Sequence, residues 1–269
     1  MILVNGDVCT QVAANDRGLS YGDGVFRTML MQAGKVKNWS LHYAKLVDDC
    51  SKLALTCPDN DLFKKDISNL SSNENGVIKL MVTRGIGMRG YAVQSGMPVT
   101  RISMWSAMPQ FEDKILHEGI RARWCQLRLS RQPVLAGVKH LNRLENVLAR
   151  SEWQDADILE GLLMDESGNV ICGTMSNVFV IKGRYLYTPD LSGCGIAGVT
   201  RARVLAGAES IGLMTKITVL SVADVLAADE VIVTNSVIGI WQIRSLAERR
   251  WEAGQFTPLI RAYLEMDND

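Results

Sequence analysis

The chain has 269 residues, of which 47% are hydrophobic and 22% charged, so it can bury one large or two medium cores. Its 29 Lys and Arg residues balance 29 Asp and Glu residues without any block of like charge, and we therefore predict no nucleic-acid partner. A signal peptide and a long apolar run are both missing, so we expect no membrane span and a cytoplasmic protein.

The six cysteines form no close CxxC pair, and three histidines are too few for a convincing metal cluster. We therefore expect reduced thiols and no metal site.

The first 109 residues predict a smaller α/β lobe. Residues 1–36 contain short β-rich runs broken by the turn signals "NGD", "DRG" and "GDG". Residues 40–55 predict a helix with Ser40 as its N-cap, because Leu41, Lys45, Leu46, Cys50 and Leu53 follow one helical face. Residues 76–85 and 100–109 predict paired strands that flank a glycine-rich loop.

The segment "PQFEDK", residues 109–114, is the most polar joint in the middle of the chain and marks the predicted domain boundary. We expect lobes at 1–109 and 116–269, and an α+β chain overall. The predicted elements of the larger lobe are a strand at 120–130, a helix from 141, strands alternating with turns over 160–189, a helix opened by Gly198, a strand at 216–222, a short helix at 223–230 and a strand at 231–237.

A single lysine, Lys139, stands out in "GVKHLNRLENVLAR". Apolar residues spaced by three and four from Leu141 predict a helix that starts just beyond Lys139. The apolar run "VLAGV" directly precedes this lysine. Desolvation and a helix N-terminus both disfavour the charged amine, and a neutral amine is the nucleophile that a carbonyl cofactor needs. An ordinary surface lysine is the alternative interpretation.

Two weaker signals indicate an anion site. "GIAGVTRARVL" places Gly198 and Thr200 at a helix start, where backbone N–H groups and the helix dipole can hold a phosphate. "VTNSV", residues 233–237, ends a predicted strand with hydrogen-bonding side chains. Helix capping explains the first signal equally well.

Taken together, these motifs resemble the fold-type IV pyridoxal-phosphate enzymes, which include branched-chain aminotransferases, D-amino-acid aminotransferases and aminodeoxychorismate lyases. The segments that carry the resemblance are "DRGLSYGDGVFRT", "LHYAKL", "TRGIGMRGY", "GVKHLNRLENVLAR", "GNVICGTMSNVFVIKGRYLYTP", "AGVTR" and "AADEVIVTNS". Within the family, "RGIGMRGY" and "KHLNRLE" are most similar to the lyases. The resemblance implies a two-domain α+β fold, pyridoxal 5'-phosphate as cofactor and a homodimer.

The resemblance also implies roles for individual residues. Lys139 corresponds to the lysine that binds the cofactor covalently, and Thr28 to a residue that lines the cofactor pocket. The residues of the implied phosphate cradle are Val199, Thr200, Ser236 and Lys45, where Lys45 replaces an arginine that the family usually has. Arg143 is placed to reach the ring oxygen of the cofactor, although a helical arginine that faces solvent is the alternative.

Cys172 departs from the family pattern, which usually has a glutamate paired with the pyridine nitrogen of the cofactor. A thiol cannot hold this nitrogen protonated, so the electron sink is weaker. Transamination should lose most from this change, whereas a lyase reaction that forms an aromatic ring tolerates it better.

The lyase resemblance implies a dicarboxylate substrate, 4-amino-4-deoxychorismate. Arg89 and Tyr91 in the loop "GIGMRGY" are candidates to bind a carboxylate, because arginine offers a forked donor. Lys139 and Thr28 are the candidate catalytic residues. Two alternatives stay open: an aminotransferase of D- or branched-chain amino acids on the same fold, and a binding protein that has lost the chemistry.

Overall fold

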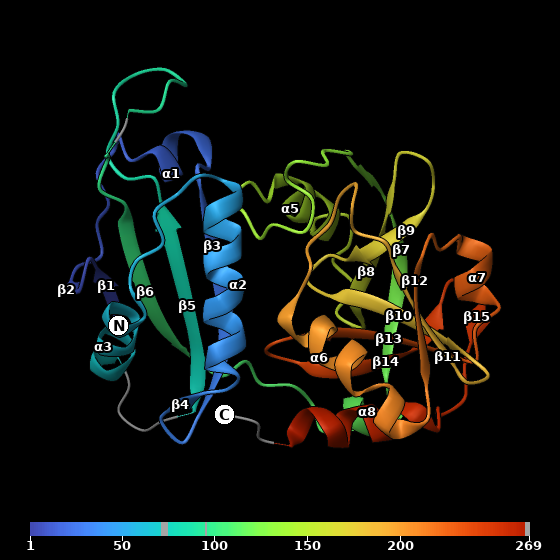
Figure 1. The fold of residues 1–269 in the computed structure, drawn as a ribbon. Coiled ribbons are helices and arrows are strands. Elements are labelled where there is room, and N and C mark those ends of the chain that lie inside the picture. The colour runs from blue at the N-terminus through green and yellow to red at the C-terminus, as the bar shows by residue number, and fades with distance from the viewer. Residues whose placement is uncertain (71–74, 95, 267–269) are drawn as a thin grey trace. The chain divides into compact units, whose positions relative to one another are not determined.

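The computed structural model describes residues 1–70, 75–94 and 96–266, which form two compact units (Figure 1). The first unit comprises Met1–Pro109 together with Val138–Asn142. The second comprises, within the described residues, Gln110–Gly137 and 143–266. Each unit has its own sheet and its own hydrophobic core. Ser95, in the predicted glycine-rich loop, lies outside the described residues.

The first unit contains an antiparallel sheet, six-stranded in the described residues, with the order β2-β1-β6-β5-β3-β4. Its strands are β1 (Ile2–Val4), β2 (Asp7–Val8), β3 (Gly24–Gln32), β4 (Lys35–Val36), β5 (Gly76–Thr83) and β6 (Thr100–Ala107). The predicted pairing of the two strands around the glycine-rich loop is confirmed, because β5 and β6 pair from Gly76 opposite Ala107 to Thr83 opposite Thr100.

The helices of the first unit are α1 (Arg17–Tyr21), α2 (Trp39–Lys52) and α3 (Asn60–Leu70). The predicted helix corresponds to α2, but Asn38 and not Ser40 is its N-cap residue. Its buried face contains Leu46 and Cys50 as expected, whereas Leu41 is 45% exposed. The buried face is rotated toward Asp49, so a carboxylate points into this unit.

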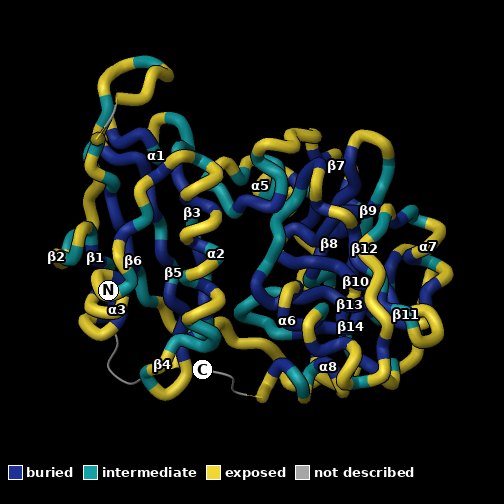
Figure 2. Tube along the Cα trace, in the orientation of Figure 1, coloured by how far each residue is buried: buried dark blue, intermediate teal, exposed yellow. Residues whose placement is uncertain are grey.

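The second unit contains a mixed sheet, nine-stranded in the described residues, with the order β12-β11-β10-β13-β14-β7-β8-β9 and β15 paired to β14. Its strands are β7 (Ile120–Leu129), β8 (Ile158–Asp165), β9 (Val170–Gly173), β10 (Asn177–Lys182), β11 (Tyr185–Pro189), β12 (Met214–Thr218), β13 (Glu230–Asn235), β14 (Gly239–Leu246) and β15 (Arg249–Arg250). Strands β10 and β13 are almost entirely buried (Figure 2), which explains the apolar runs 178–181 and 231–233 at their centres.

Helices cover the sheet of the second unit. They are α4 (Lys114–Glu118), α5 (Leu144–Arg150), α6 (Val199–Gly207), the 3-10 helix η1 (Glu209–Ile211), α7 (Val222–Leu226) and α8 (Phe256–Glu265). Val204 of α6 and Ile260 of α8 share one core cluster with Phe179 and Ile232 of the strands. Val225 of α7 belongs to a different cluster, with Val178 among its members. The helix predicted to open at Gly198 is confirmed, since Gly198 is the N-cap residue of α6.

The Lys139 segment differs from its predicted structure. We expected it in the C-terminal lobe, directly before a helix, but Val138–Asn142 packs with the first unit and α5 begins only at Leu144. The Phe26 N–H donates to the Lys139 carbonyl at 2.9 Å, and the Leu141 N–H donates to the Gly24 carbonyl at 2.9 Å. These bonds hold the segment along β3 in an extended conformation. A helix N-terminus directly beside Lys139 therefore does not contribute to its environment.

No helix in the described ranges is long and apolar enough to cross a membrane. All six cysteines carry free thiols. Within the same residues, His, Cys, Asp and Glu side chains form no group of three that could hold a metal ion.

Candidate active site

The Lys139 amine lies over an aromatic ring. Its Nζ is 4.6 Å from the centroid of Phe26, and the Lys79 Nζ is 5.3 Å from the same centroid. Thr28 is two residues from Phe26 on β3 and pairs with Lys79 of β5, so its side chain belongs to the same face of the sheet. This face therefore brings together two of the predicted catalytic residues, Lys139 and Thr28, with a second amine that the sequence did not single out.

The backbone of Lys139 is held by a buried carboxylate. Its N–H donates to Asp49 Oδ2 at 3.2 Å, and the Asp49 side chain is fully buried on α2. Arg27 of β3 and Lys45 of α2 both form ion pairs with the same carboxylate. Burial lowers the pKa of Arg27 to about 10, which leaves its guanidinium charged at neutral pH. One carboxylate thus joins two cations to the main chain of Lys139.

Lys45, predicted to contact a phosphate, donates to two carboxylates. Its Nζ bonds Asp48 Oδ2 at 2.7 Å and also Asp49 Oδ1. Burial lowers the pKa of Lys45, and the hydrogen bond to Asp48 opposes that shift. A phosphate at Lys45 would share the ammonium group with these carboxylates, so this role stays a prediction.

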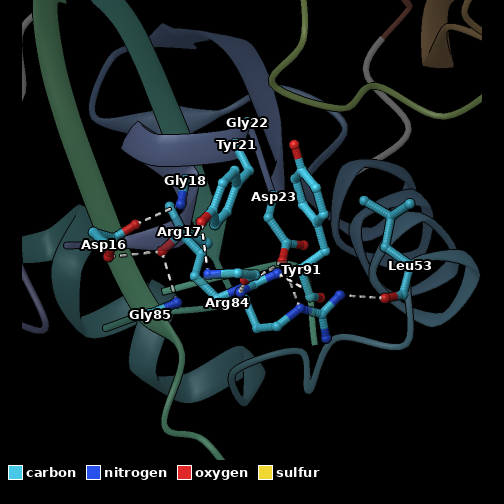
Figure 3. A network of polar contacts seen from close by, with 12 residues as sticks. Asp16, Arg17, Gly18, Tyr21, Gly22, Asp23, Leu53, Arg84, Gly85 and Tyr91 are labelled. Carbon is cyan, nitrogen blue, oxygen red and sulfur yellow. Dashed lines mark hydrogen bonds and ion pairs between the residues drawn. The ribbon is translucent and has the colours of Figure 1, made fainter. Parts of the chain in front are cut away.

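The loop that carries Arg89 and Tyr91 is anchored by α1 (Figure 3). Arg17 Nη1 donates to the Gly90 carbonyl at 2.9 Å, and Arg17 Nη2 donates to the Tyr91 carbonyl at 3.2 Å. The Gly90 N–H donates to the Tyr21 hydroxyl at 3.1 Å. The side chains of Arg89 and Tyr91 are exposed, so a held backbone presents them to solvent. This arrangement suits a binding loop on a rigid support.

A buried ionic network supports that anchor (Figure 3). Asp23 Oδ2 accepts from Arg17 Nε at 2.9 Å and from Arg84 Nε at 2.8 Å. Burial raises the pKa of Asp23, but the hydrogen bonds from Arg84 and Arg17 outweigh burial and hold the pKa below its ordinary value. Arg84 also donates to the Leu53 and Ala54 carbonyls beyond the end of α2. The loop is thereby tied to the helix that carries Asp49.

In the second unit, the predicted phosphate residues meet at the start of α6. Thr200 Oγ1 lies 3.4 Å from Ser236 Oγ, and the first N–H groups of α6, including those of Val199 and Thr200, have no acceptor within the helix. Asn235 Oδ1 accepts from the Val237 and Ile238 N–H groups and so holds the turn that carries Ser236. Two hydroxyls and a helix N-terminus are a donor set suited to an anion.

Asn177 has a structural role. Its Nδ2 donates to the Ile196 carbonyl at 2.8 Å, and its Oδ1 accepts from the Gly198 N–H at 3.1 Å. A Cβ at position 198 would lie 2.4 Å from Asn177 Oδ1, so glycine is required for this close approach. Asn177 therefore orders the loop that leads into α6.

Cys172 is buried in a hydrophobic cluster together with Leu163 and Ile171. Burial raises the pKa of its thiol well above the ordinary value, and the charge of Glu160 adds to this effect, so the side chain is neutral. The charge of Arg143 acts in the opposite direction on the same thiol. Burial also lowers the pKa of Arg143, whose Nη1 donates to Asn146 at 3.4 Å. Arg143 therefore lies close enough to Cys172 for its charge to influence the pKa of the thiol.

The Glu160 carboxylate organises the segment after Cys172. Oε1 accepts from the Gly161 N–H at 2.9 Å and from Thr174 through its N–H at 2.8 Å and its hydroxyl at 2.6 Å. Oε2 accepts from the Ser176 hydroxyl at 2.6 Å. Oε1 is therefore fully used by neighbouring donors, and Oε2 is held by Ser176.

The sequence contains signals for the residues that the motifs did not identify. Glu160 and Lys79 interrupt otherwise apolar strands, and a charge in a buried strand requires a partner. Asp49 follows Leu46 by three residues and adjoins Cys50, so it lies on the buried face of its helix. None of these signals indicates which atoms the charges contact.

The two sheets and the sites they carry define a fold-type IV enzyme. The chain belongs to the amino-transferase class IV family, whose model matches residues 24–246. It is 34% identical over 250 residues to an aminodeoxychorismate lyase of Vibrio harveyi, with 92% of each chain covered. A D-alanine aminotransferase of Bacillus licheniformis is 26% identical, over 97% of this chain and 93% of that protein.

The structural comparison agrees with the sequence comparison. The crystal structure of 4-amino-4-deoxychorismate lyase from Pseudomonas aeruginosa matches with a TM-score of 0.95 at 40% identity, and 100% of both chains is covered. The branched-chain aminotransferase of Escherichia coli matches with a TM-score of 0.84 at 22% identity, which shows the shared fold. The resemblance inferred from the motifs is confirmed.

Proposed function

We propose that this protein is a pyridoxal-phosphate-dependent lyase that converts 4-amino-4-deoxychorismate into 4-aminobenzoate and pyruvate, a step toward folate. The observation that carries the proposal is the placement of the Lys139 amine over Phe26, on the sheet face that also bears Thr28. The similarity to lyases at 34% and 40% identity over nearly the whole chain supports it.

Each unit contains residues that suit one group of this cofactor. The hydroxyls of Thr200 and Ser236 and the N-terminus of α6 suit a phosphate. The Lys139 amine suits an aldehyde. A neutral thiol at position 172 is a weaker partner for the pyridine nitrogen than a carboxylate, and Arg143, whose charge acts on that thiol, is the proposed partner of the ring oxygen.

Lys139 and Thr28 would perform the proton transfers. When bound, the cofactor withdraws electrons from the substrate carbon that bears the amine. Lys139 would hold the cofactor, and its amine, once free, would accept the proton from that carbon. The enolpyruvate C–O bond breaks at the neighbouring carbon, and the departing oxygen takes a proton from the Thr28 hydroxyl or from Lys139. Enolpyruvate becomes pyruvate, and the ring becomes aromatic.

A coupled assay tests the proposal directly. Purified protein with pyridoxal phosphate should release 4-aminobenzoate and pyruvate in equal amounts from 4-amino-4-deoxychorismate, both detected by chromatography. Absence of both products from a loaded, folded protein would overturn the lyase assignment. Transfer of the amine to a 2-oxo acid, without aromatic product, would favour the aminotransferase alternative.

Arg89→Ala should raise the substrate KM more than it weakens cofactor binding. The loss of a charge-assisted hydrogen bond to a carboxylate costs roughly 1.5–3 kcal/mol, a factor of about 10–100. Arg89→Lys should give an intermediate KM, because the charge remains without the forked donor. Steady-state kinetics measure both variants. A KM equal to that of the parent in Arg89→Ala would mean that this loop arginine does not bind substrate.

Cys172→Glu should favour transamination relative to elimination. A carboxylate stabilises the protonated pyridine nitrogen, which helps transamination more than a reaction driven by aromatisation. The larger, charged side chain enters a buried position near Glu160, and overpacking costs about 1–3 kcal/mol, so cofactor occupancy and melting temperature must be measured too. Cys172→Gln is the matched control of similar size without charge. Unchanged relative rates on D-alanine and the lyase substrate would contradict the prediction.

We further propose a cytoplasmic homodimer. The family resemblance implies the dimer, and helix α5 exposes Leu144 by 75%, Val147 by 57% and Leu148 by 59%. Exposed apolar side chains that adjoin one another are typical of a surface covered by another protein. Six free thiols suit a reducing compartment. Analytical ultracentrifugation measures the oligomeric state.

A further inference from the structure

We infer that Asp49 is a positioning residue for Lys139, because its carboxylate accepts the Lys139 backbone N–H and fixes the chain from which the amine projects. This inference rests on the proposed function, in which Lys139 binds the cofactor. The contact is the hydrogen bond from the Lys139 N–H to Asp49 Oδ2 at 3.2 Å.

The Lys139 backbone lies outside regular secondary structure and depends on two neighbouring elements. Its carbonyl accepts from the Phe26 N–H of β3 at 2.9 Å. Its N–H donates to a side chain of α2. A strand and a helix therefore hold the two polar groups of one peptide residue. If the acceptor on α2 is removed, only the strand holds this residue, and the direction of its side chain is less well defined.

The position of Asp49 explains how a carboxylate can serve as this acceptor. Asp49 is fully buried, and an isolated buried charge is strongly unfavourable. Arg27 and Lys45 pair with it, so the carboxylate remains ionised. Arg27 is itself 2% exposed, and its Nε has no hydrogen-bond partner among the described residues. Arg27 thus pairs with Asp49 although one of its own donors is left unsatisfied.

A second buried carboxylate in the same unit provides a matched control. Asp66 on α3 is 1% exposed and accepts from Arg101 Nε at 2.7 Å and from Ser103 Oγ at 2.7 Å. Asp49 and Asp66 thus share a helix location and an arginine partner on a strand. Asp49 differs from Asp66 in its contacts to the Lys139 N–H and to Lys45.

The experiment compares two substitutions of Asp49 that differ in whether they offer an acceptor to the Lys139 N–H and to Lys45. Asp49→Asn and Asp49→Leu have similar volumes, but only asparagine offers an oxygen to the Lys139 N–H. Both are made together with Arg27→Met, which removes the guanidinium that would otherwise be buried without a counter-charge. Pyridoxal phosphate is added to apoprotein, and the visible absorbance and the fraction of borohydride label on Lys139 are followed with time. Rates are normalised to the folded fraction from circular dichroism.

We expect the asparagine variant to label Lys139 within about threefold of the rate of Arg27→Met alone, and the leucine variant at least tenfold more slowly. The corresponding pair at Asp66, made with Arg101→Met, should show equal rates. Equal rates for the Asp49 pair would overturn the inference, as would a difference of the same size at Asp66. If the leucine variants at both positions fail to fold while the asparagine variants fold, Asp49 has a purely structural role. Absence of label on Lys139 in the unmodified protein would instead refute the proposed function.

Discussion

Lys139→Ala should form no 4-aminobenzoate above the background reaction and should show no visible absorption from bound cofactor. The substitution removes the amine that lies over Phe26, and with it both the covalent attachment of the cofactor and the proposed proton acceptor. Removal of a nucleophile that also acts as the base typically costs many orders of magnitude in rate. Absorbance spectra and the 4-aminobenzoate assay measure the two effects on the same sample.

Borohydride reduction of the loaded parent protein, followed by peptide mapping, should place the label on Lys139. Lys79→Ala is the matched control, because Lys79 shares the Phe26 ring and should leave the label where it is. A label on Lys79, or on any other lysine, would show that the cofactor is bound elsewhere. Retained activity in Lys139→Ala would have the same consequence.

Much of the fold could be predicted from local patterns. Paired strands around the glycine-rich loop and the helix after Gly198 follow from alternation and helix-start signals, and both are present. The start of the Lys139 helix could not be predicted, because Leu141 has the spacing of a helix but bonds to Gly24 of a distant strand. Apolar spacing does not show whether a segment pairs with a strand that lies far away in the chain.

The site was predictable where motifs exist and unpredictable where side chains meet across the fold. Lys139, Thr200 and Ser236 follow from motifs, and the structure places the last two within 3.4 Å of each other. The carboxylate of Asp49 reaches Lys139 across 90 residues of sequence, and no local pattern encodes that contact. Glu160 also has partners that no motif identifies, because Thr174 and Ser176 follow the end of β9, 14 and 16 residues further along the chain.

Glu160→Ala should lower the free energy of unfolding by about 3–5 kcal/mol, because several buried donors lose their acceptor and each unsatisfied buried donor costs about 1–3 kcal/mol. Glu160 is fully buried, and its removal leaves the Gly161 and Thr174 donors without their acceptor. For a domain of 150–250 residues each kcal/mol shifts the melting temperature by about 2–4 °C, so a decrease of roughly 10 °C is expected in a thermal melt. Glu166→Ala, at an exposed carboxylate of the same hairpin, should leave the melting temperature nearly unchanged.

Glu160→Gln should lower the free energy of unfolding by far less, about 1 kcal/mol, because glutamine can keep most of the hydrogen bonds that Glu160 makes. The amide oxygen can keep the three donors now at Oε1, from the Gly161 N–H, the Thr174 N–H and the Thr174 hydroxyl. The amide nitrogen can donate to Ser176, whose hydroxyl can rotate from donor to acceptor. If the alanine and glutamine variants melt at the same temperature, then the negative charge, and not the hydrogen bonds, stabilises this segment. In that case Cys172→Glu should destabilise the protein by more than its added volume requires, because the new carboxylate is repelled by the charge of Glu160.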